Sequence, residues 1–170
     1  MGKHNIMLVD DEEYVLNSLK RSLRREGYGL VSFTGALEAL AYLEEKNTID
    51  MIISDHRMPS ITGLEFLIEV RKKYPDIIRI LLTGYADMEV AIRAINEGKL
   101  YRFLTKPWKD EELKATLINA IQYRNLVLRN QELLHQIKVQ EDHIQSLETR
   151  YPGISEVKRD KSGAILIDEV

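Results

Sequence analysis

A continuous apolar run, Met51-Ile52-Ile53, leads directly into Ser54-Asp55, and Pro59 follows soon afterwards. The run is too short for a helix, and it lacks the alternation of apolar and polar residues expected of a strand with one solvent-exposed face. It therefore predicts a strand buried on both faces, as in parallel sheets. Asp55 would stand at the carboxyl end of this strand, where parallel α/β sheets bind their ligands. An aspartate at this place could also simply cap the following turn.

Four further apolar runs of similar length are Asn5–Val9, Leu30–Phe33, Ile77–Leu82 and Leu100–Leu104. Between the runs, apolar residues recur at spacings typical of amphipathic helices, and strands that alternate with helices form right-handed βαβ units. The sequence therefore predicts an α/β fold, a doubly wound five-stranded parallel sheet in the flavodoxin-like order 2-1-3-4-5. An extended C-terminal helix should begin near Asp110 and continue to about Arg150.

Residues that can bind metal or phosphate stand at the carboxyl ends of four of these runs: Asp10, Asp11, Asp55, Thr83 and Lys106. In the predicted strand order they border one crevice, and the three carboxylates are oxygen ligands suited to Mg²⁺. Asp55 could then attack a phosphoryl donor and form an acyl phosphate. Lys106 and Thr83 could bind the phosphoryl oxygens. Part of the acidic cluster could instead serve as the N-terminus of the first helix.

Four motifs surround these positions: Val9-Asp10-Asp11-Glu12, Ser54-Asp55-His56-Arg57-Met58-Pro59 with Thr62-Gly63, Leu82-Thr83-Gly84, and Leu104-Thr105-Lys106-Pro107-Trp108. Over about residues 3–122 the chain closely resembles the receiver domain of bacterial two-component response regulators. The resemblance implies phosphorelay signal transduction. In this process a sensor histidine kinase, or a phosphotransfer protein, would phosphorylate Asp55.

The resemblance also implies a particular set of metal ligands. Asp11 would bind Mg²⁺ directly and Asp10 largely through water, while Asp55 and the backbone carbonyl of Arg57 would complete the protein ligands. The side chains of Arg57 and Tyr85 occupy positions that flank the attacking water during dephosphorylation in this family. They are therefore expected to influence the lifetime of the phosphorylated state.

Further roles that the resemblance implies concern the response to phosphorylation. Thr83 would be the switch hydroxyl, and Phe103 would occupy the aromatic switch position, where the family often has tyrosine. Because phenylalanine has no hydroxyl group, coupling through Phe103 would depend on the packing of its ring. The peptide bond between Lys106 and Pro107 would be cis. His56 is expected to be a solvent-exposed loop residue.

The region after the last predicted strand contains a heptad pattern. Its a and d positions are Tyr123, Leu126, Asn130, Leu133, Ile137, Gln140, Ile144 and Leu147. Isoleucine at a, leucine at d and a single asparagine at a favour a parallel two-stranded coiled coil. The pattern therefore predicts a parallel homodimer, although an amphipathic helix packed on its own domain would show similar spacing.

The patterns predict three segments: a receiver domain over residues 1–122, a coiled-coil helix over 123–150 that continues the last receiver helix, and a tail over 151–170. The tail contains two short apolar runs on either side of the turn-like Asp160-Lys161-Ser162-Gly163, which would fit a small β-hairpin. A lone hairpin is marginally stable in water, so the tail would pack on something or begin a further domain.

The composition excludes several classes of function. The 24 basic and 27 acidic residues give a net charge of -3, so the chain lacks the excess of positive charge typical of proteins that bind nucleic acid or an anionic membrane. There is no cysteine, and the 4 histidines are scattered, so disulfides and sites built on cysteine or clustered histidine are not expected. No segment reads as a signal peptide or a membrane span, which predicts a cytoplasmic protein.

Two other functions fit parts of the sequence. One is a metal-dependent, phosphatase-like enzyme that uses an aspartyl phosphate, but haloacid-dehalogenase-like enzymes carry an aspartate two residues after the nucleophile, where this chain has Arg57. The other is a structural dimerisation module that is not phosphorylated. The leading interpretation is a signalling module rather than an enzyme, with self-catalysed phosphotransfer and dephosphorylation, that signals through changed dimer or partner contacts.

Overall fold

The computed structural model describes residues 4–46 and 48–152, and it contains a five-stranded sheet in the order β2-β1-β3-β4-β5. The strands are β1 (Asn5–Val9), β2 (Gly29–Phe33), β3 (Met51–Asp55), β4 (Ile78–Thr83) and β5 (Arg102–Thr105). All neighbouring strands run parallel. The predicted α/β fold and its strand order are therefore confirmed.

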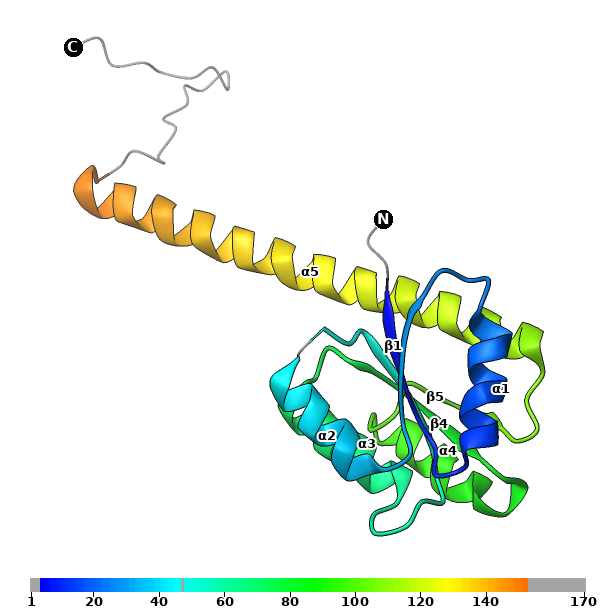
Figure 1. Ribbon diagram of the computed structural model, residues 1–170. Helices are drawn as coiled ribbons and strands as arrows, with labels where there is room; N and C mark the ends of the chain where they lie inside the picture. Colours follow the sequence, from blue (N-terminus) through cyan, green and yellow to red (C-terminus); the bar gives the residue numbers. More distant parts are fainter. Residues whose placement is uncertain (1–3, 47, 153–170) are drawn as a thin grey trace. The chain divides into compact units, whose positions relative to one another are not determined.

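Helices connect the strands and cover both faces of the sheet (Figure 1). They are α1 (Glu13–Leu23), α2 (Ala36–Glu45), α3 (Gly63–Lys73), α4 (Met88–Asn96) and α5 (Asp110–Arg150), with a short 3₁₀ helix, η1 (Tyr85–Asp87), before α4. The start and end of α5 agree with the expectation from the sequence.

Several element boundaries differ by one or two residues from the apolar runs in the sequence; β2, for example, begins at Gly29, and β4 extends from Ile78 to Thr83. Helix α1 ends at Leu23, and Gly27 adopts a positive φ of 76° in the turn that follows. The glycine therefore serves the turn and not the helix end itself. Strand β5 begins at Arg102 rather than at Leu100, because the Leu100 amide still donates to the Ala94 carbonyl at the end of α4.

Alternating side chains along the strands divide the interior into two hydrophobic cores, one on each face of the sheet. In β1, Ile6 and Leu8 pack with α1 and the beginning of α5, whereas Met7 and Val9 pack with α2, α3 and α4. Each such buried side chain contributes about 1.5–3 kcal/mol relative to an exposed one. This patterning fixes the register of β1 and β3, which pairs Val9 with Ser54 and brings the two strand ends together.

The chain divides into two compact units, one through Asn125 and one from Leu126 onward. In the first unit, α5 packs on the sheet through Leu113, Thr116, Leu117 and Ala120. In the second, α5 continues to Arg150. The predicted hairpin within residues 151–170 lies outside the described residues, which end at Pro152. Within residues 4–46 and 48–152, no helix has the length and apolar character needed to span a lipid bilayer.

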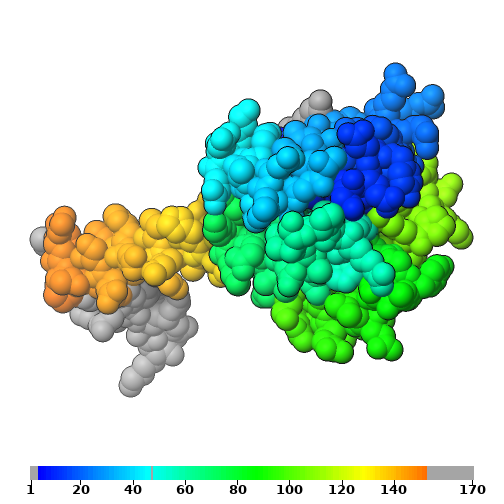
Figure 2. All heavy atoms as spheres, turned by 60° about the horizontal axis from the view of Figure 1, so that its bottom comes forward, coloured from blue at the N-terminus to red at the C-terminus, as the bar shows by residue number. Residues whose placement is uncertain are grey.

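The carboxyl ends of the strands open onto the lower edge of the sheet in Figure 1. Figure 2 brings this edge forward, and the surface of the early part of α1 borders that of the segment around α3 there. The loops after β1, β3, β4 and β5 all reach this edge, which is where the sequence places its candidate site.

Candidate functional site

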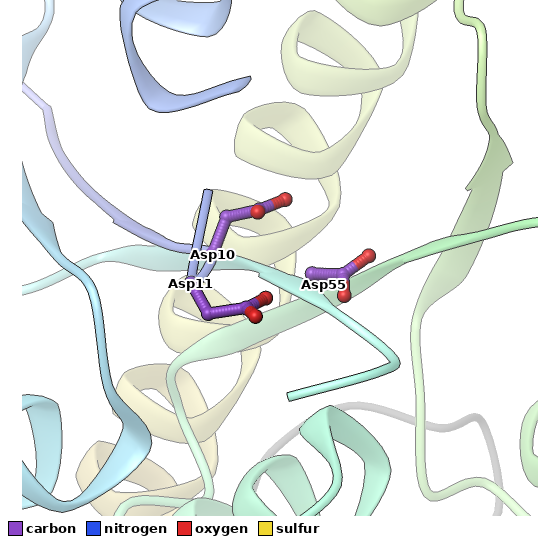
Figure 3. Close-up of side chains that lie close together, drawn as sticks. All are labelled: Asp10, Asp11 and Asp55. Atoms are coloured by element: carbon purple, nitrogen blue, oxygen red, sulfur yellow. The ribbon is translucent and has the colours of Figure 1, made fainter. Parts of the chain in front are cut away.

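Three carboxylates lie together at the carboxyl ends of β1 and β3 (Figure 3). Asp10, Asp11 and Asp55 each offer one oxygen, and these oxygens all lie within 4.8 Å of one another. Asp10 is fully buried and Asp55 is 7% exposed, whereas Asp11 is exposed. Carboxylates held this close repel one another, and a hard divalent cation such as Mg²⁺ fits such a set of oxygen donors.

Lys106 neutralises part of this charge. Its Nζ lies 2.7 Å from Asp10 Oδ2 and 2.6 Å from Asp55 Oδ1, so a single ammonium group bridges two acids from different strands. Burial opposes the charged form of Lys106, but the hydrogen bonds that its ammonium group donates to Asp10 and Asp55 outweigh this effect and raise its pKa above the usual value. Burial also raises the pKa of Asp10, and the contact with Lys106 offsets only part of this effect.

Asp55 is held from two sides. The backbone N–H of Arg57 donates to Asp55 Oδ2 at 2.8 Å, which fixes the orientation of the carboxylate. Gly63, the first residue of α3, packs against the Asp55 backbone so closely that a Cβ on Gly63 would lie 1.7 Å from the Asp55 carbonyl oxygen. Any larger residue at position 63 would therefore displace the strand end that carries Asp55.

The start of α3 is fixed by a capping box. Thr62 Oγ1 accepts from the Glu65 backbone N–H at 3.2 Å, and the Glu65 carboxylate accepts from the Thr62 N–H at 2.8 Å. Such caps stabilise a helix by about 1 kcal/mol. The Thr62-Gly63 pair thus combines helix initiation with the close approach that positions Asp55.

The remaining predicted site residues lie at the ends of β4 and β5. Thr83 is buried, and its hydroxyl donates to the Gly84 carbonyl at 3.2 Å. Phe103 pairs with Leu81 in the sheet register and is partly buried against the core that α4 covers. The peptide bond between Lys106 and Pro107 is cis.

Trp108 and Lys106 line a shared cavity of about 660 Å³ that extends to Tyr14 of α1. The tryptophan is partly buried in the core formed by α1 and α5. Trp108 thus shares a cavity with Lys106, the residue that contacts Asp10 and Asp55.

His56 differs from the expectation of a solvent-exposed loop residue. It is half-buried, and its Nδ1 is buried with no hydrogen-bond partner among the described residues. Its backbone N–H donates to the Leu82 carbonyl and its carbonyl accepts from Gly63 N–H, both at 2.9 Å. The backbone of His56, next to Asp55, is therefore tied to both β4 and α3.

A contact that the sequence did not indicate joins Arg57 to Asp87. The guanidinium donates two hydrogen bonds to the carboxylate, from Nε at 2.7 Å and from Nη2 at 3.0 Å. This contact lowers the pKa of Asp87 and raises that of Arg57. The only signal in the sequence for Asp87 is that aspartate is a common residue before a helix, which does not reveal its distant partner.

The family of the chain follows from its relatives. Residues 6–118 match the family model of the response regulator receiver domain. The hydrogenase transcriptional regulatory protein HoxA of Cupriavidus necator is 37% identical over 121 residues, 71% of this chain and 25% of HoxA. The DNA-binding transcriptional regulator NtrC of Proteus hauseri is 32% identical over 121 residues, again 71% of this chain and 25% of NtrC. The chain thus spans about a quarter of the length of these relatives.

Solved structures agree with this relationship. A crystal structure of a protein from Neptuniibacter caesariensis is 44% identical, with a TM-score of 0.71 over 75% of this chain and 93% of that one. A response regulator receiver domain protein from Clostridium thermocellum is 33% identical, with a TM-score of 0.69 over 73% of this chain and 98% of that one. With its sequence, its fold and its relatives in agreement, the chain belongs to the response regulator receiver domain family.

Proposed function

We propose that this chain is a phosphoacceptor that receives a phosphoryl group on Asp55 from a sensor histidine kinase or a phosphotransfer protein. The observation that carries the proposal is a group of three carboxylates at the carboxyl edge of the sheet, two of which, Asp10 and Asp55, contact Lys106. Phosphohistidine is made from ATP, so we also propose that the exchange takes place in the cytoplasm. The chain would act as a signalling module and not as an enzyme with a separate substrate.

The chemistry follows from the position of Asp55. A carboxylate oxygen of Asp55 attacks the phosphorus of the donor phosphohistidine, forming an acyl phosphate, and the P–N bond breaks with its electron pair left on the imidazole nitrogen. Lys106 already contacts Asp55 at 2.6 Å, so its ammonium group can follow the transferred charge onto a phosphoryl oxygen. In a separate hydrolytic step, water attacks the phosphorus of the acyl phosphate, the P–O bond to Asp55 breaks, and inorganic phosphate is released as the carboxylate is regenerated.

The acid cluster fits Mg²⁺ as the metal of this site. Asp10, Asp11 and Asp55 would hold it, together with the backbone carbonyl of Arg57. When bound, Mg²⁺ neutralises negative charge on the phosphoryl group and on the carboxylates around it. The Arg57 N–H keeps Asp55 oriented while one of its oxygens reacts.

Thr83 and Phe103 would report phosphorylation to the rest of the domain. The Thr83 hydroxyl donates to the Gly84 carbonyl, and it would exchange this acceptor for a phosphoryl oxygen. The movement of Thr83 opens space that the half-buried Phe103 ring would enter. The surface formed by α4, β5 and α5 would change in consequence.

We propose that signalling also involves a parallel homodimer formed by the coiled-coil helix of residues 123–150, beyond a receiver domain of residues 1–122. In the second compact unit the seam residues Leu126, Leu133, Ile137 and Ile144 are 48–69% exposed. A second copy of the chain would bury these side chains, and Asn130 at an a position would fix the register of the two helices.

Mass spectrometry after incubation with acetyl phosphate and Mg²⁺ tests the phosphoacceptor proposal. The wild type should gain one phosphoryl group, and Asp55→Asn or the addition of a chelator should prevent this. Equal labelling of Asp55→Asn would refute the assignment.

Sedimentation tests the dimer separately. Truncation after Gln122 should leave a folded monomer, and the longer chain should dimerise. A truncated domain that remains dimeric would place the interface on the receiver domain itself.

A further inference from the structure

The ion pair between Arg57 and Asp87 connects two parts of the edge that surrounds Asp55. Arg57 belongs to the loop after β3, and its side chain is 72% exposed, whereas Asp87 ends η1 and is 18% exposed. Both hydrogen bonds have good geometry for a guanidinium facing a carboxylate. The pair therefore ties the nucleophile loop to the first turn of α4.

Arg57 contacts the nucleophile as well. Its backbone N–H donates to Asp55 Oδ2 at 2.8 Å while its guanidinium binds Asp87. Arg57 thus connects Asp55 directly to the start of α4, and this connection does not involve Thr83 or Phe103. The guanidinium also interacts electrostatically with the Asp55 carboxylate, although it makes its hydrogen bonds to Asp87.

The segment held by this ion pair has little fully buried apolar surface. No residue of η1 is buried, and the fully buried residues of α4 are Ala91 and Ala94, two small side chains, with Ile95 partly buried against the same core. An element with so little buried apolar area moves at low cost. A contact at its N-terminus can therefore have a measurable effect on its position.

We propose that Asp87 is a positioning residue that restrains the Arg57 guanidinium away from the phosphoryl site and so opposes phosphorylation of Asp55. This inference rests on the proposed phosphoacceptor function. A phosphoryl group on Asp55 offers a second anion, with oxygens that a guanidinium binds in bidentate fashion. When Arg57 exchanges the carboxylate for the phosphoryl oxygens, η1 and the first turn of α4 are released.

Linkage between the two contacts gives the expected size of the effect. If the ion pair exists in the unphosphorylated form and is lost in the phosphorylated one, it stabilises the unphosphorylated form by a certain factor in the equilibrium. Removing the pair must then raise the affinity for a phosphoryl group by that same factor. Exposed ion pairs of this kind are weak, so the expected factor is about two- to fivefold. The factor should decrease as added salt screens the pair.

Calorimetric titration with beryllofluoride and Mg²⁺, a stable mimic of the phosphoryl group, tests the inference. Asp87→Asn should bind the mimic about two- to fivefold more tightly than the wild type at low salt. The gain should be largely abolished in about 1 M salt, and Asp87→Glu should restore affinity to near the wild-type value. Glu44→Gln is the matched control, because it removes another exposed ion pair, with Lys73 at 2.7 Å.

A double-mutant cycle distinguishes this mechanism from a general loss of structure. In an Arg57→Gln background, Asp87→Asn should produce no further gain, because the guanidinium that it restrains is absent. Equal affinities of wild type and Asp87→Asn, or an undiminished gain in the Arg57→Gln background, would overturn the inference. A folded wild type that does not bind beryllofluoride would refute the phosphoacceptor function, and the inference would be lost with it.

Discussion

Two aspartates lie at the two ends of β3, and their surroundings distinguish an aspartate with a structural role from one in the candidate functional site. Asp50, directly before the strand, receives a hydrogen bond from the Asn5 N–H at 2.9 Å on one oxygen and contacts Arg124 at 3.0 Å through the other. Asp55, at the opposite end, shares Lys106 with Asp10 and has Asp11 beside it.

The difference is one of charge balance. The Asp50 carboxylate contacts Arg124, and His4 Nδ1 lies 3.5 Å from its Oδ2, so its charge is matched and its role is to join β1, β3 and α5. Around Asp55, three carboxylates are gathered near one lysine. Natural selection for stability alone would not favour uncompensated charge in a partly buried place. An excess of acid at a strand end is therefore a better sign of a metal and phosphoryl site than an ion pair by itself.

The largest expected effect comes from exchanging the two aspartates for asparagine. Asp55→Asn should abolish phosphoryl uptake without lowering the free energy of unfolding, because it removes one of three mutually repelling carboxylates. Asp50→Asn should keep the uptake and lower stability. Intact-mass measurement and urea unfolding provide the two readouts. Loss of uptake in a folded Asp50→Asn would show that the two strand ends are not functionally separate.

Arg124→Gln should destabilise the first compact unit by about 2 kcal/mol, since hydrogen bonds to charged groups contribute about 1.5–3 kcal/mol. Arg124 also donates to the Asp76 carbonyl at 3.1 Å, so the substitution leaves two acceptors without this donor. Urea unfolding measures the change, and Arg129→Gln, at an exposed position further along α5, is the control. Similar stabilities of the two variants would remove Arg124 from the structural role assigned to it.

Mg²⁺ should stabilise the protein through the site at the carboxyl end of β3, and not through the contacts of Asp50 at its amino end. At a metal concentration ten times the Kd, the free energy of unfolding should rise by about 1.4 kcal/mol. Asp11→Asn should lose most of this gain, whereas Asp50→Asn should retain it. Trp108 fluorescence gives a second readout, because the indole lines the same cavity as Lys106. Equal stabilisation of Asp11→Asn would exclude that carboxylate as a ligand.

The sequence was sufficient to predict the fold and the position of the strand-end residues, because both depend on local patterns. Short apolar runs that alternate with amphipathic helical segments indicate a parallel sheet. Residues that directly follow the strands of such a sheet all lie at its carboxyl edge. Asp10, Asp55 and Lys106 are brought together for this reason.

Contacts that depend on side-chain reach between loops could not be predicted in this way. The pair formed by Arg57 and Asp87 depends on the short η1 helix, whose three residues show no periodic pattern. The contact of Asp50 with Arg124 requires the exact point at which α5 crosses the start of β3. The partial burial of His56 was also missed, because a single residue in a loop has no periodic pattern that would reveal it.

The smallest expected effect is a difference in alkaline sensitivity between the two ends of β3. The pKa of Lys106 is raised above its ordinary value of 10.5, so the folded state binds this proton more tightly than the unfolded chain. The resulting stability is fully present below pH 10.5 and is lost as the pH rises through the higher folded-state pKa. A guanidinium does not deprotonate in proteins, so the contact of Asp50 with Arg124 should persist over the same range.

The measurement is the free energy of unfolding of wild type, Lys106→Gln and Arg124→Gln, each without Mg²⁺ and between about pH 8 and 11.5. The difference between wild type and Lys106→Gln should shrink toward the upper end of this range, because wild-type Lys106 then also loses its charge. The difference between wild type and Arg124→Gln should stay nearly constant. If both differences shrink together, alkaline unfolding has a common cause elsewhere, and the two ends of β3 do not differ in the way that their ion pairs indicate.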